Sequence, residues 1–591
     1  MPRLLASLLL SLFLTIPASA AEYRAWWVET FNTPLGTASD IGRIIDAAVA
    51  SNTNALFVQV RRRGDSWYLD TKEPLTETPG VGEPDATGRW TFDPLRYLVE
   101  QAHARGIEVH AFVIATSIYN ADPAVARPKD PSHVFNAHFW DAAANAPIPA
   151  SATRQWSTRA LPHNVDMGSN MKVTYDGNRF DTQWCIDPGH PDAAAYTVEV
   201  LTHLVSRYEV DGLHLDRIRY PEAPIDRPPG EPYGINVGYN EVNVARFRAR
   251  HGDAARYYTS GVEAGYPVTN DALWNQWRRD QVSALVRRIW LEATAVRPTI
   301  AVSAALITYW SGPSASGGFE KTEAYWRVFQ DWESWAEEGI IDVLAPMNYK
   351  REHDANGRAQ YDDWMEFTKR TARANGRHSL IGLATYLNAI EGSLRQTRRA
   401  LARPPFDAGN TSADGVIFYA LGSTSPGSAG STNTSVTSNP WSYPTPGEST
   451  PVRPASDFFS AMRTGSTVAG ARLEDPALTP VFAAPAGTPP MTWKESPTKG
   501  HLMGIARLPG GIVADGATVV VENGATGATR TATADGNGFY GFIGLEPGMW
   551  KVTATLGGAA MSGGAVEITA GRVARGDLAA EARPRRRLLW R

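Results

Sequence analysis

The segment Asp211-Gly-Leu-His-Leu-Asp216 alternates apolar and polar side chains in the manner of a β-strand with two different faces. Strand geometry places His214 and Asp216 on one face and the two leucines on the other. We expect the leucines to cover a layer of helices and the polar pair to face the interior of the domain. A carboxylate in that position is costly to bury unless it is paired or used.

Seven further apolar or β-branched runs lie between residues 22 and 422, separated by amphipathic stretches with apolar spacings of three and four. With the first segment, the eight runs are Arg24–Phe31, Ala55–Arg61, Ile107–Ile114, Gly212–Tyr220, Thr299–Ile307, Asp342–Tyr349, Leu380–Leu387 and Gly415–Leu421. Eight strands that alternate with helices predict an α/β fold, a (β/α)8 TIM barrel with enlarged loops over residues 22–422. A doubly wound open sheet is the alternative, and the absence of a GxGxxG turn after the first run weakens it.

The two ends of the chain differ from the predicted barrel. Residues 1–20 combine a basic start, an apolar run and Ala18-Ser-Ala20, which predicts a secretory signal peptide; the run is short for an uncleaved membrane anchor. Residues 423–500 predict a linker and an extension that packs on the barrel. Residues 501–580 predict a small β-sandwich with few obligatory contacts to the barrel. Residues 581–591 form a basic tail, either a solvated terminus or a contact to an anionic envelope surface.

The composition excludes several classes of function. The chain carries 57 basic and 61 acidic residues, a formal charge of −4, whereas nucleic-acid-binding proteins normally have a large basic excess. Cys185 is the single cysteine, which excludes a disulfide framework and a cysteine-rich metal site. The sequence has no HExxH, P-loop or GxSxG motif and no second long apolar stretch. We therefore predict no metal, no cofactor and no stable membrane span in the mature protein.

Polar residues at the predicted strand ends are the candidates for a functional site, because barrel enzymes place their reacting groups there. They are Glu29, Arg61, His110, His214, Asp216, Asn348 and Tyr349. Such a mixture of donors and acceptors suits polyol recognition, although each residue singly could be a satisfied polar group of the core. Asp187 precedes a proline and is interpreted first as a helix N-cap. Three loop residues, Trp67, Trp184 and Trp310, could stack on sugar faces.

Several of these stretches resemble the glycosyl hydrolase-like 10 family of bacterial envelope and secreted proteins. They are Arg24–Val28, Asn54–Arg61 with Gly64-Asp65, Gly106–Ala111, Asp187–Pro191, Tyr208–Pro221 and Ala345–Tyr349. The resemblance covers the whole predicted barrel and implies a hydrolase-like domain that acts on glycans, in some relatives on bacterial cell-wall glycan strands. Two places depart from the family pattern: strand three continues as Phe112-Val-Ile-Ala, and Arg217 follows Asp216 where a second acidic residue is common. Separately, Asp535–Phe542 with Leu545–Trp550 resembles carboxypeptidase regulatory-like domains, which usually serve as binding modules or spacers and do not catalyse.

The combined prediction is an exported glycoside hydrolase, secreted or in the cell envelope, whose partner is a polysaccharide or peptidoglycan glycan. Asp216 would act as nucleophile or base, and Glu29 is the first candidate for the general acid. Other candidates for that acid are Asp65, Glu352 and Asp354, and a chitinase-like route is disfavoured because Ile218 stands where its glutamate would be. The substrate would be held by Arg61, Asp65, His110, His214, Asn348 and Tyr349, and Arg61 could instead orient Asp216. The alternatives are a carbohydrate-binding protein without catalysis and an envelope scaffold.

Overall fold

The computed structural model describes residues 21–121, 126–162, 173–174, 177–226, 234–402, 412–424, 453–466 and 479–579. The predicted signal peptide, most of the predicted linker and the basic tail lie outside these residues. Within the described part of the chain, no helix has the length and hydropathy needed to cross a membrane.

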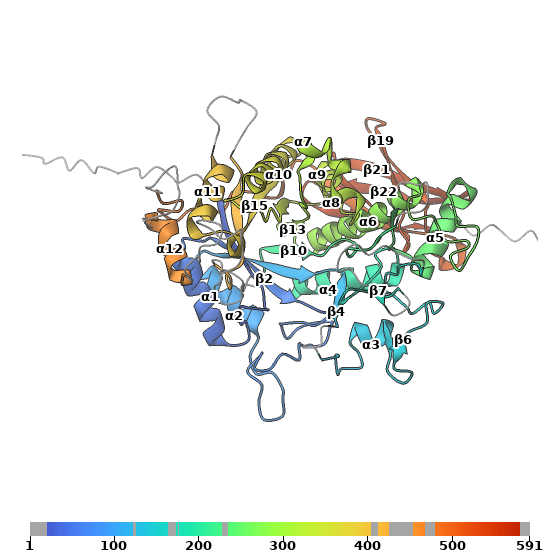
Figure 1. Ribbon diagram of the computed structural model, residues 1–591. Coiled ribbons are helices and arrows are strands. Elements are labelled where there is room, and N and C mark those ends of the chain that lie inside the picture. The colour runs from blue at the N-terminus through green and yellow to red at the C-terminus, as the bar shows by residue number, and fades with distance from the viewer. Residues whose placement is uncertain are drawn as a thin grey trace, which may run out of the picture.

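Eight parallel strands close into a barrel, which confirms the predicted fold class (Figure 1). They are β1 (Tyr23–Val28), β2 (Ala55–Arg61), β3 (Glu108–Ile114), β10 (Gly212–Asp216), β13 (Ala301–Leu306), β14 (Val343–Pro346), β15 (His378–Ala384) and β16 (Gly415–Tyr419). Each strand pairs with its neighbours in chain order, and β16 pairs with β1. All eight carboxyl ends therefore meet at one rim, which we call the barrel mouth.

Alternate strand residues separate two layers of the core. Trp27, Phe57 and Phe112 fill the barrel interior, and their rings surround the imidazole of His214. Leu213 and Leu215 belong to the larger core between strands and helices. The alternation of the fourth strand thus places its side chains as its sequence predicts.

A ring of helices covers the outside of the barrel. The longer ones are α1 (Ala38–Ala50), α2 (Pro94–His103), α4 (Pro191–Arg207), α6 (Ala272–Val296), α9 (Trp332–Glu338), α10 (Ala355–Ala374) and α11 (Ile390–Leu401). The start of α1 shows how the sequence sets such a helix: Thr37 and Asp40 form a reciprocal capping box. The amphipathic stretch over residues 326–338 is not one continuous helix, because α8 (Glu323–Trp326) ends before Phe329, which has a left-handed φ of 56°, and α9 begins after Asp331.

Long loops after β3 and β10 carry structure of their own. The first contains β4 (Ser117–Asn120), α3 (Val134–His138), β5 (Trp140–Asp141), β6 (Ala146–Pro147), β7 (Val173–Thr174), β8 (Arg179–Phe180) and β9 (Gln183–Cys185). Its rings, including Phe135 and Trp184, form a separate small core, and Cys185 is buried beside it. The second contains β11 (Ile225–Asp226), β12 (Gly234–Ile235), α5 (Glu241–His251) and η1 (Gly252–Ala254). Shorter turns near the later strands are α7 (Pro313–Ser316), η2 (Phe319–Lys321) and η3 (Thr385–Leu387).

The C-terminal domain is all-β and has its own core. Its strands are β17 (Gly500–Arg507), β18 (Thr518–Asn523), β19 (Thr529–Thr533), β20 (Phe539–Leu545), β21 (Gly548–Leu556), β22 (Ala559–Ile568), β23 (Val573–Arg575) and β24 (Leu578–Ala579), with the turn η4 (Pro509–Gly511). Before it, α12 (Ala455–Thr464) packs on α1 and α11. Trp493 of α13 (Thr492–Glu495) packs against the core inside the barrel and donates to Asp342 at 2.8 Å.

The sandwich is docked on the barrel more firmly than the sequence suggests. Phe539 and Ile543 of β20 belong to the main core, and α6 packs on the same strand (Figure 1). Arg246 of α5 forms an ion pair of 2.7 Å with Asp515. Nothing in the pattern of the linker indicates this contact, because it is made by side chains far apart in the sequence.

Candidate functional site

Two predicted carboxylates, Asp216 and Glu29, lie at the barrel mouth. Asp216 ends β10 and is half-buried, and its Oδ1 accepts the backbone N–H of Arg217 at 2.7 Å. Glu29 directly follows β1 and is buried; its Oε2 accepts the N–H groups of Phe31 at 2.6 Å and Asn32 at 3.0 Å. Burial raises the pKa of Glu29, and the hydrogen bonds from Asn32 and Phe31 offset only part of that increase.

Tyrosine rings form the wall around these two carboxylates. Burial, followed by the negative charges of Glu29 and Asp216, raises the pKa of Tyr419, so both carboxylates act on this ring. Tyr349 lies 5.3 Å from Tyr419 between ring centroids and 6.1 Å from Trp27. Its pKa is also raised, by burial first and then by its neighbours, which include Asp216. The structure therefore brings Asp216, Glu29 and Tyr349 together, with both phenols protonated near neutral pH.

A cleft of about 450 Å3 opens beside this group, between the loops that follow β10, β13 and β14. We call it the Tyr349 cleft; its lining includes Glu222, Tyr309, Trp310, Tyr349, Lys350 and Asp354. Trp310 is 68% exposed, whereas Trp67 and Trp184 are buried and cannot stack on a ligand. Lys350 donates to the Thr308 carbonyl at 2.7 Å, and burial lowers the pKa of its amine to about 8. The cleft thus offers one aromatic platform together with charged and hydroxyl groups.

Glu222 is a candidate that the sequence analysis missed. It is half-buried in the cleft, and its Oε1 accepts a hydrogen bond from the Tyr309 hydroxyl. Burial lowers the pKa of Arg219, but Tyr309, Glu222 and Asp216 together raise it above its ordinary value. Arg219 therefore interacts electrostatically with both Asp216 and Glu222. The available signal was position, because Glu222 directly follows the strand-four segment that ends at Pro221.

The two predicted histidines lie inside the barrel and not at its mouth. His214 is fully buried; Trp27 Nε1 donates to its Nε2 at 2.9 Å, and its Nδ1 pairs with Ser303 Oγ at 2.9 Å. Burial lowers the pKa of His214 to about 3, so the ring is neutral. His110 is fully buried too and stacks on Phe57 at 4.2 Å. The expected contact with sugar hydroxyls is corrected here: both rings face inward as predicted, but they lie too deep to reach a ligand.

Arg61 also has a different environment from the one expected. Its guanidinium is fully buried and forms two hydrogen bonds of 2.6 Å with Glu73, and Nη1 donates to the Ile114 carbonyl. Every arm of the planar fork is therefore engaged within the protein, and none is directed to Asp216 or to a ligand. No sequence pattern indicates Glu73 as this partner, because it lies in the loop after β2.

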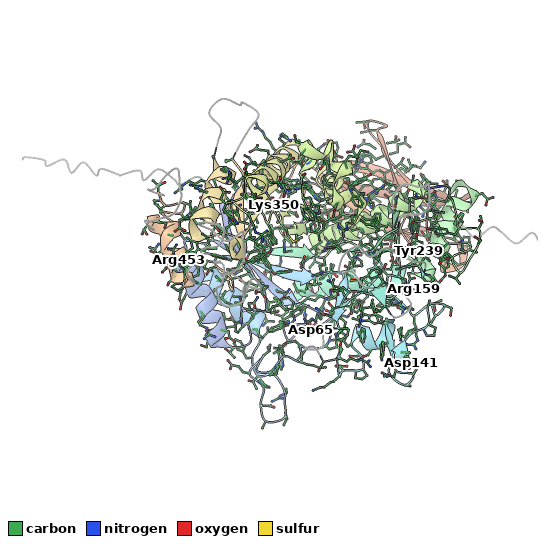
Figure 2. All side chains as sticks on the ribbon, in the orientation of Figure 1. Asp65, Asp141, Arg159, Tyr239, Lys350 and Arg453 are labelled. Carbon is green, nitrogen blue, oxygen red and sulfur yellow. The ribbon has the colours of Figure 1, made fainter. Side chains whose placement is uncertain are left out.

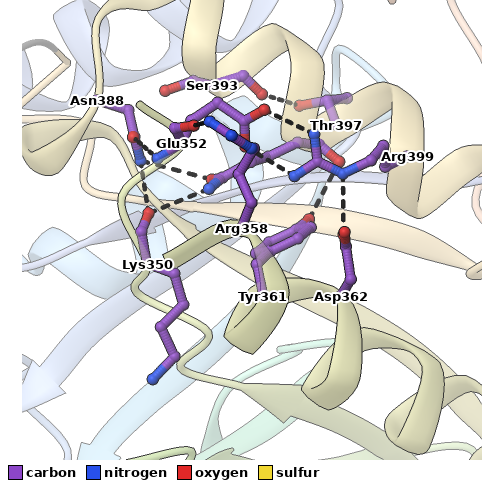
Figure 3. A network of polar contacts seen from close by, with 10 residues as sticks. Lys350, Glu352, Arg358, Tyr361, Asp362, Asn388, Ser393, Thr397 and Arg399 are labelled. Carbon is purple, nitrogen blue, oxygen red and sulfur yellow. Dashed lines mark hydrogen bonds and ion pairs between the residues drawn. The ribbon is translucent and has the colours of Figure 1, made fainter. Parts of the chain in front are cut away.

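The acidic residues after β14 serve the local structure. Glu352 is buried and receives two hydrogen bonds from Arg399, at 2.6 and 2.7 Å (Figure 3). Asp354 caps α10 by accepting the Gly357 N–H at 2.7 Å. Asn348 is buried and donates to the Tyr361 carbonyl at 2.8 Å. Glu352 and Asn348 are thus corrected from site candidates to residues that stabilise the loop after β14. Asp354 lies at the edge of the cleft and serves as the N-cap of α10.

Asp65 lies in a second hollow, of about 300 Å3, formed by the loops after β2 and β3. This Arg62 hollow is lined by Arg62, Arg63, Asp65, Thr76, Thr78 and Lys129, among others. It shares no lining residue with the Tyr349 cleft, and Figure 2 places Asp65 and Lys350 on different parts of the molecule. Asp65 therefore lines a different space from Glu222 and Tyr349.

Asp187 is not the helix N-cap that its proline neighbour suggests, since α4 begins after His190. Its Oδ1 instead accepts hydrogen bonds from Gly189 N–H at 2.8 Å, the Tyr220 hydroxyl at 2.9 Å and Asn243 Nδ2 at 3.1 Å. Burial raises the pKa of Asp187 to about 6. The residue joins the turn before α4 to the segments after β10 and in α5.

Comparison with known proteins gives two family matches. Residues 23–229 and 234–395 match the family described as glycosyl hydrolase-like 10. Residues 502–581 match the carboxypeptidase regulatory-like domain, as their sequence suggests.

Individual relatives are more distant. Glycosyl hydrolase YngK of Bacillus subtilis is 23% identical over 349 residues, which cover 58% of this chain and 55% of the relative. Glycosyl hydrolase DigH of Escherichia coli is 22% identical over 345 residues, which cover 56% of this chain and 62% of the relative. The chain thus matches less than two thirds of the length of either relative. Among solved structures, the PgaB (BpsB) glycoside hydrolase domain from Bordetella bronchiseptica aligns over 68% of this chain and 94% of its own, with 12% identity and a TM-score of 0.40.

Proposed function

Because the chain belongs to the glycosyl hydrolase-like 10 family, we propose that it is an exported glycoside hydrolase that cleaves a polysaccharide at the barrel mouth. Bacterial cell-wall glycan is the first substrate to test, and export rests on the predicted signal peptide. The observation that carries the proposal is the pair of half-buried carboxylates, Asp216 and Glu222, which both act on the charge of Arg219. Glu222 lines a cleft with an exposed tryptophan, and Asp216 acts on Tyr349 of the same cleft.

In this proposal Asp216 is the nucleophile or the general base, and Glu222 is the general acid. Glu222 is preferred to Glu29 because it lines the cleft, where a leaving-group oxygen can reach it. The oxygens of Glu29 already accept N–H groups from Phe31 and Asn32, so this carboxyl is better suited to shaping the mouth. The hydrogen bond from Tyr309 fixes the orientation of the Glu222 carboxyl.

The reaction follows from the chemistry of two carboxyl groups on opposite sides of a glycosidic bond. Glu222 gives its proton to the departing oxygen while positive charge develops at the anomeric carbon. Asp216 either bonds to that carbon or removes a proton from an attacking water molecule. Trp310 supplies a flat apolar surface for a sugar ring, and Lys350 and Tyr349 supply polar groups for its hydroxyls.

The test is a product assay with the mature chain on peptidoglycan sacculi and a panel of polysaccharides, analysed by mass spectrometry. Asp216→Asn keeps the shape of the side chain but removes its charge, so we expect turnover to fall by at least about a thousandfold with folding and binding retained. Glu222→Gln should cause a similar loss, and Glu29→Gln a smaller one. Near-normal turnover of Asp216→Asn on a confirmed substrate would contradict the assignment.

The second candidate function is a carbohydrate-binding protein without catalysis. Arg217 favours it, because this position commonly carries a second acidic residue in the family and here lacks one. That protein would retain sugar binding in the Tyr349 cleft but release no products from any substrate in the panel. Binding of oligosaccharides that is lost in Trp310→Ala, without hydrolysis in the wild type, would support this second function.

A further inference from the structure

The Arg62 hollow contains a guanidinium that is held in place but poorly hydrogen-bonded. The Arg62 guanidinium carbon lies 5.0 Å from the ring centroid of Phe31 and 5.3 Å from that of Trp67, so two aromatic side chains fix its plane. Its hydrogen bonds to the Thr30 carbonyl and the Thr78 hydroxyl are long, at 3.3 and 3.4 Å. Its Nε is buried and has no hydrogen-bond partner among the described residues. A planar guanidinium that is held in place and has weak hydrogen bonds within the protein is suited to bind a carboxylate.

The other charges of the hollow leave it able to attract an anion. Arg63 and Lys129 line the same space as Arg62. The two acidic lining residues accept backbone N–H groups of the loops: Asp65 from Arg63 at 3.0 Å, and Glu77 from Lys129 at 2.5 Å. Burial lowers the pKa of Arg62, and the nearby Asp65 and Glu29 offset only part of that decrease.

The position of the hollow connects it with the barrel mouth. Arg62 directly follows β2, and its Nη1 hydrogen bond reaches Thr30, the residue after Glu29. Phe31, whose ring contacts Arg62, is 53% exposed on the same rim. The hollow therefore adjoins the side of the barrel mouth that carries Glu29.

We propose that the Arg62 hollow is a subsite for an acidic sugar unit, with Arg62 and Lys129 binding its carboxylate and Thr76 and Asp65 binding its hydroxyls. The statement that this sugar unit is part of the substrate rests on the proposed function. The statement that the hollow binds a carboxylate does not depend on it. The proposal predicts a preference for glycans that carry carboxylates over neutral glycans of the same backbone.

The test uses the full mature chain and three small probes: glucuronate, its methyl ester and acetate, titrated by NMR at low ionic strength. The ester keeps the sugar ring and loses the charge, whereas acetate keeps the charge and lacks the ring. We expect glucuronate to bind about tenfold more tightly than either other probe, and the difference to shrink as salt is added. None of the probes has a glycosidic bond between sugars, so the outcome is independent of turnover.

Three variants and one control locate the site. Arg62→Ala should bring glucuronate to the affinity of its ester, and Arg62→Lys should recover only part of the loss because a lysine lacks the planar fork. Lys129→Met changes an exposed residue, so it tests the same hollow even where Arg62 variants fold poorly. Arg105→Ala removes an exposed arginine that does not line the hollow and should have no effect.

Three results would overturn the proposal: equal binding of glucuronate and its ester, equal binding of glucuronate and acetate, or unchanged binding in both Arg62→Ala and Lys129→Met. Failure of the glycoside hydrolase assignment would be seen elsewhere, as the absence of products from every substrate in the panel. The two ideas can therefore fail separately.

Discussion

A buried ion pair at the end of β2 decides what Arg61 does. Arg61 and Glu73 have no exposed side-chain surface and hold each other through two short hydrogen bonds. Breaking such a pair leaves one charge in the interior without compensation, which costs more than the pair itself contributes. The structural role of Arg61 is therefore to fix the loop after β2 against the end of β3.

We expect Arg61→Ala to lower the free energy of unfolding by about 3–5 kcal/mol, as measured by urea denaturation. Arg61→Met combined with Glu73→Leu removes both charges and should recover much of that loss. The folded fraction of each variant should keep its Michaelis constant, because the guanidinium does not reach a ligand. A raised Michaelis constant with normal stability would instead support a role for Arg61 in substrate binding. The control is Arg43→Ala, which changes an exposed residue of α1.

At the scale of elements, the turn before α4 depends on one carboxyl group. Asp187 ties this turn to Tyr220 and Asn243, and it is fully buried with a pKa of about 6. In the unfolded chain the same group titrates near its ordinary value of about 3.9. The folded state thus holds the proton more tightly, so this group favours folding below about pH 4, and its contribution is lost as the pH rises to about 6.

Asp187→Asn keeps an oxygen acceptor for the three donors and cannot ionise. We expect the variant to gain stability relative to the wild type as the pH rises from 4 to 7, by up to about 3 kcal/mol. Denaturant unfolding at a series of pH values measures the difference. A difference that is constant across this range would mean that Asp187 does not titrate with a raised pKa.

The elements themselves show which features a sequence reveals. The eight strands and the inward parity of Glu29, His110 and His214 follow from apolar alternation, because it is a local property. Arg61 departs from this parity, because the register of β2 shifts between Gln59 and Arg61 and Arg61 pairs with Val113 of the larger core. Depth along a strand is not local: His110 and His214 point inward but lie below the mouth, where Phe57 and Trp27 enclose them. Partners such as Glu73 for Arg61 and Arg399 for Glu352 come from distant loops and helices, which no periodicity indicates.

Glu222 was missed for a related physical reason. It lies in a loop, where side-chain direction follows from tertiary contacts such as the hydrogen bond with Tyr309 and not from a repeating pattern. The break between α8 and α9 is another case, since the left-handed φ of Phe329 interrupts an otherwise helical spacing.

For the whole molecule, the contact between barrel and sandwich is the main addition. Besides Phe539 and Ile543, the contact includes Leu291 of α6, which packs closely against Gly541. A Cβ atom added to Gly541 would lie only 2.1 Å from the Leu291 side chain. Arg288 of α6 donates to Asn537 at 2.9 Å. Removing the sandwich would therefore expose part of the main core on α6.

We expect a chain ending at residue 498 to show a Tm lower by roughly 5 °C or more and to bind a hydrophobic dye. Gly541→Leu in the full chain should act in the same direction, because it wedges the interface and leaves the sandwich present. Differential scanning calorimetry compares the three proteins. If the truncated chain keeps the full Tm and full turnover, the interface contributes little and the two domains are independent in stability.

The burial of Cys185 gives the molecule a practical property for labelling experiments. Burial raises the pKa of this thiol to about 11, so at neutral pH it is neither exposed nor ionised, and it should not react with maleimides in the native state. A cysteine introduced at Val262, which is 75% exposed, would then be the single reactive position. Fluorophores or spin labels can thus be attached at chosen sites on the wild-type background, without first removing the native cysteine.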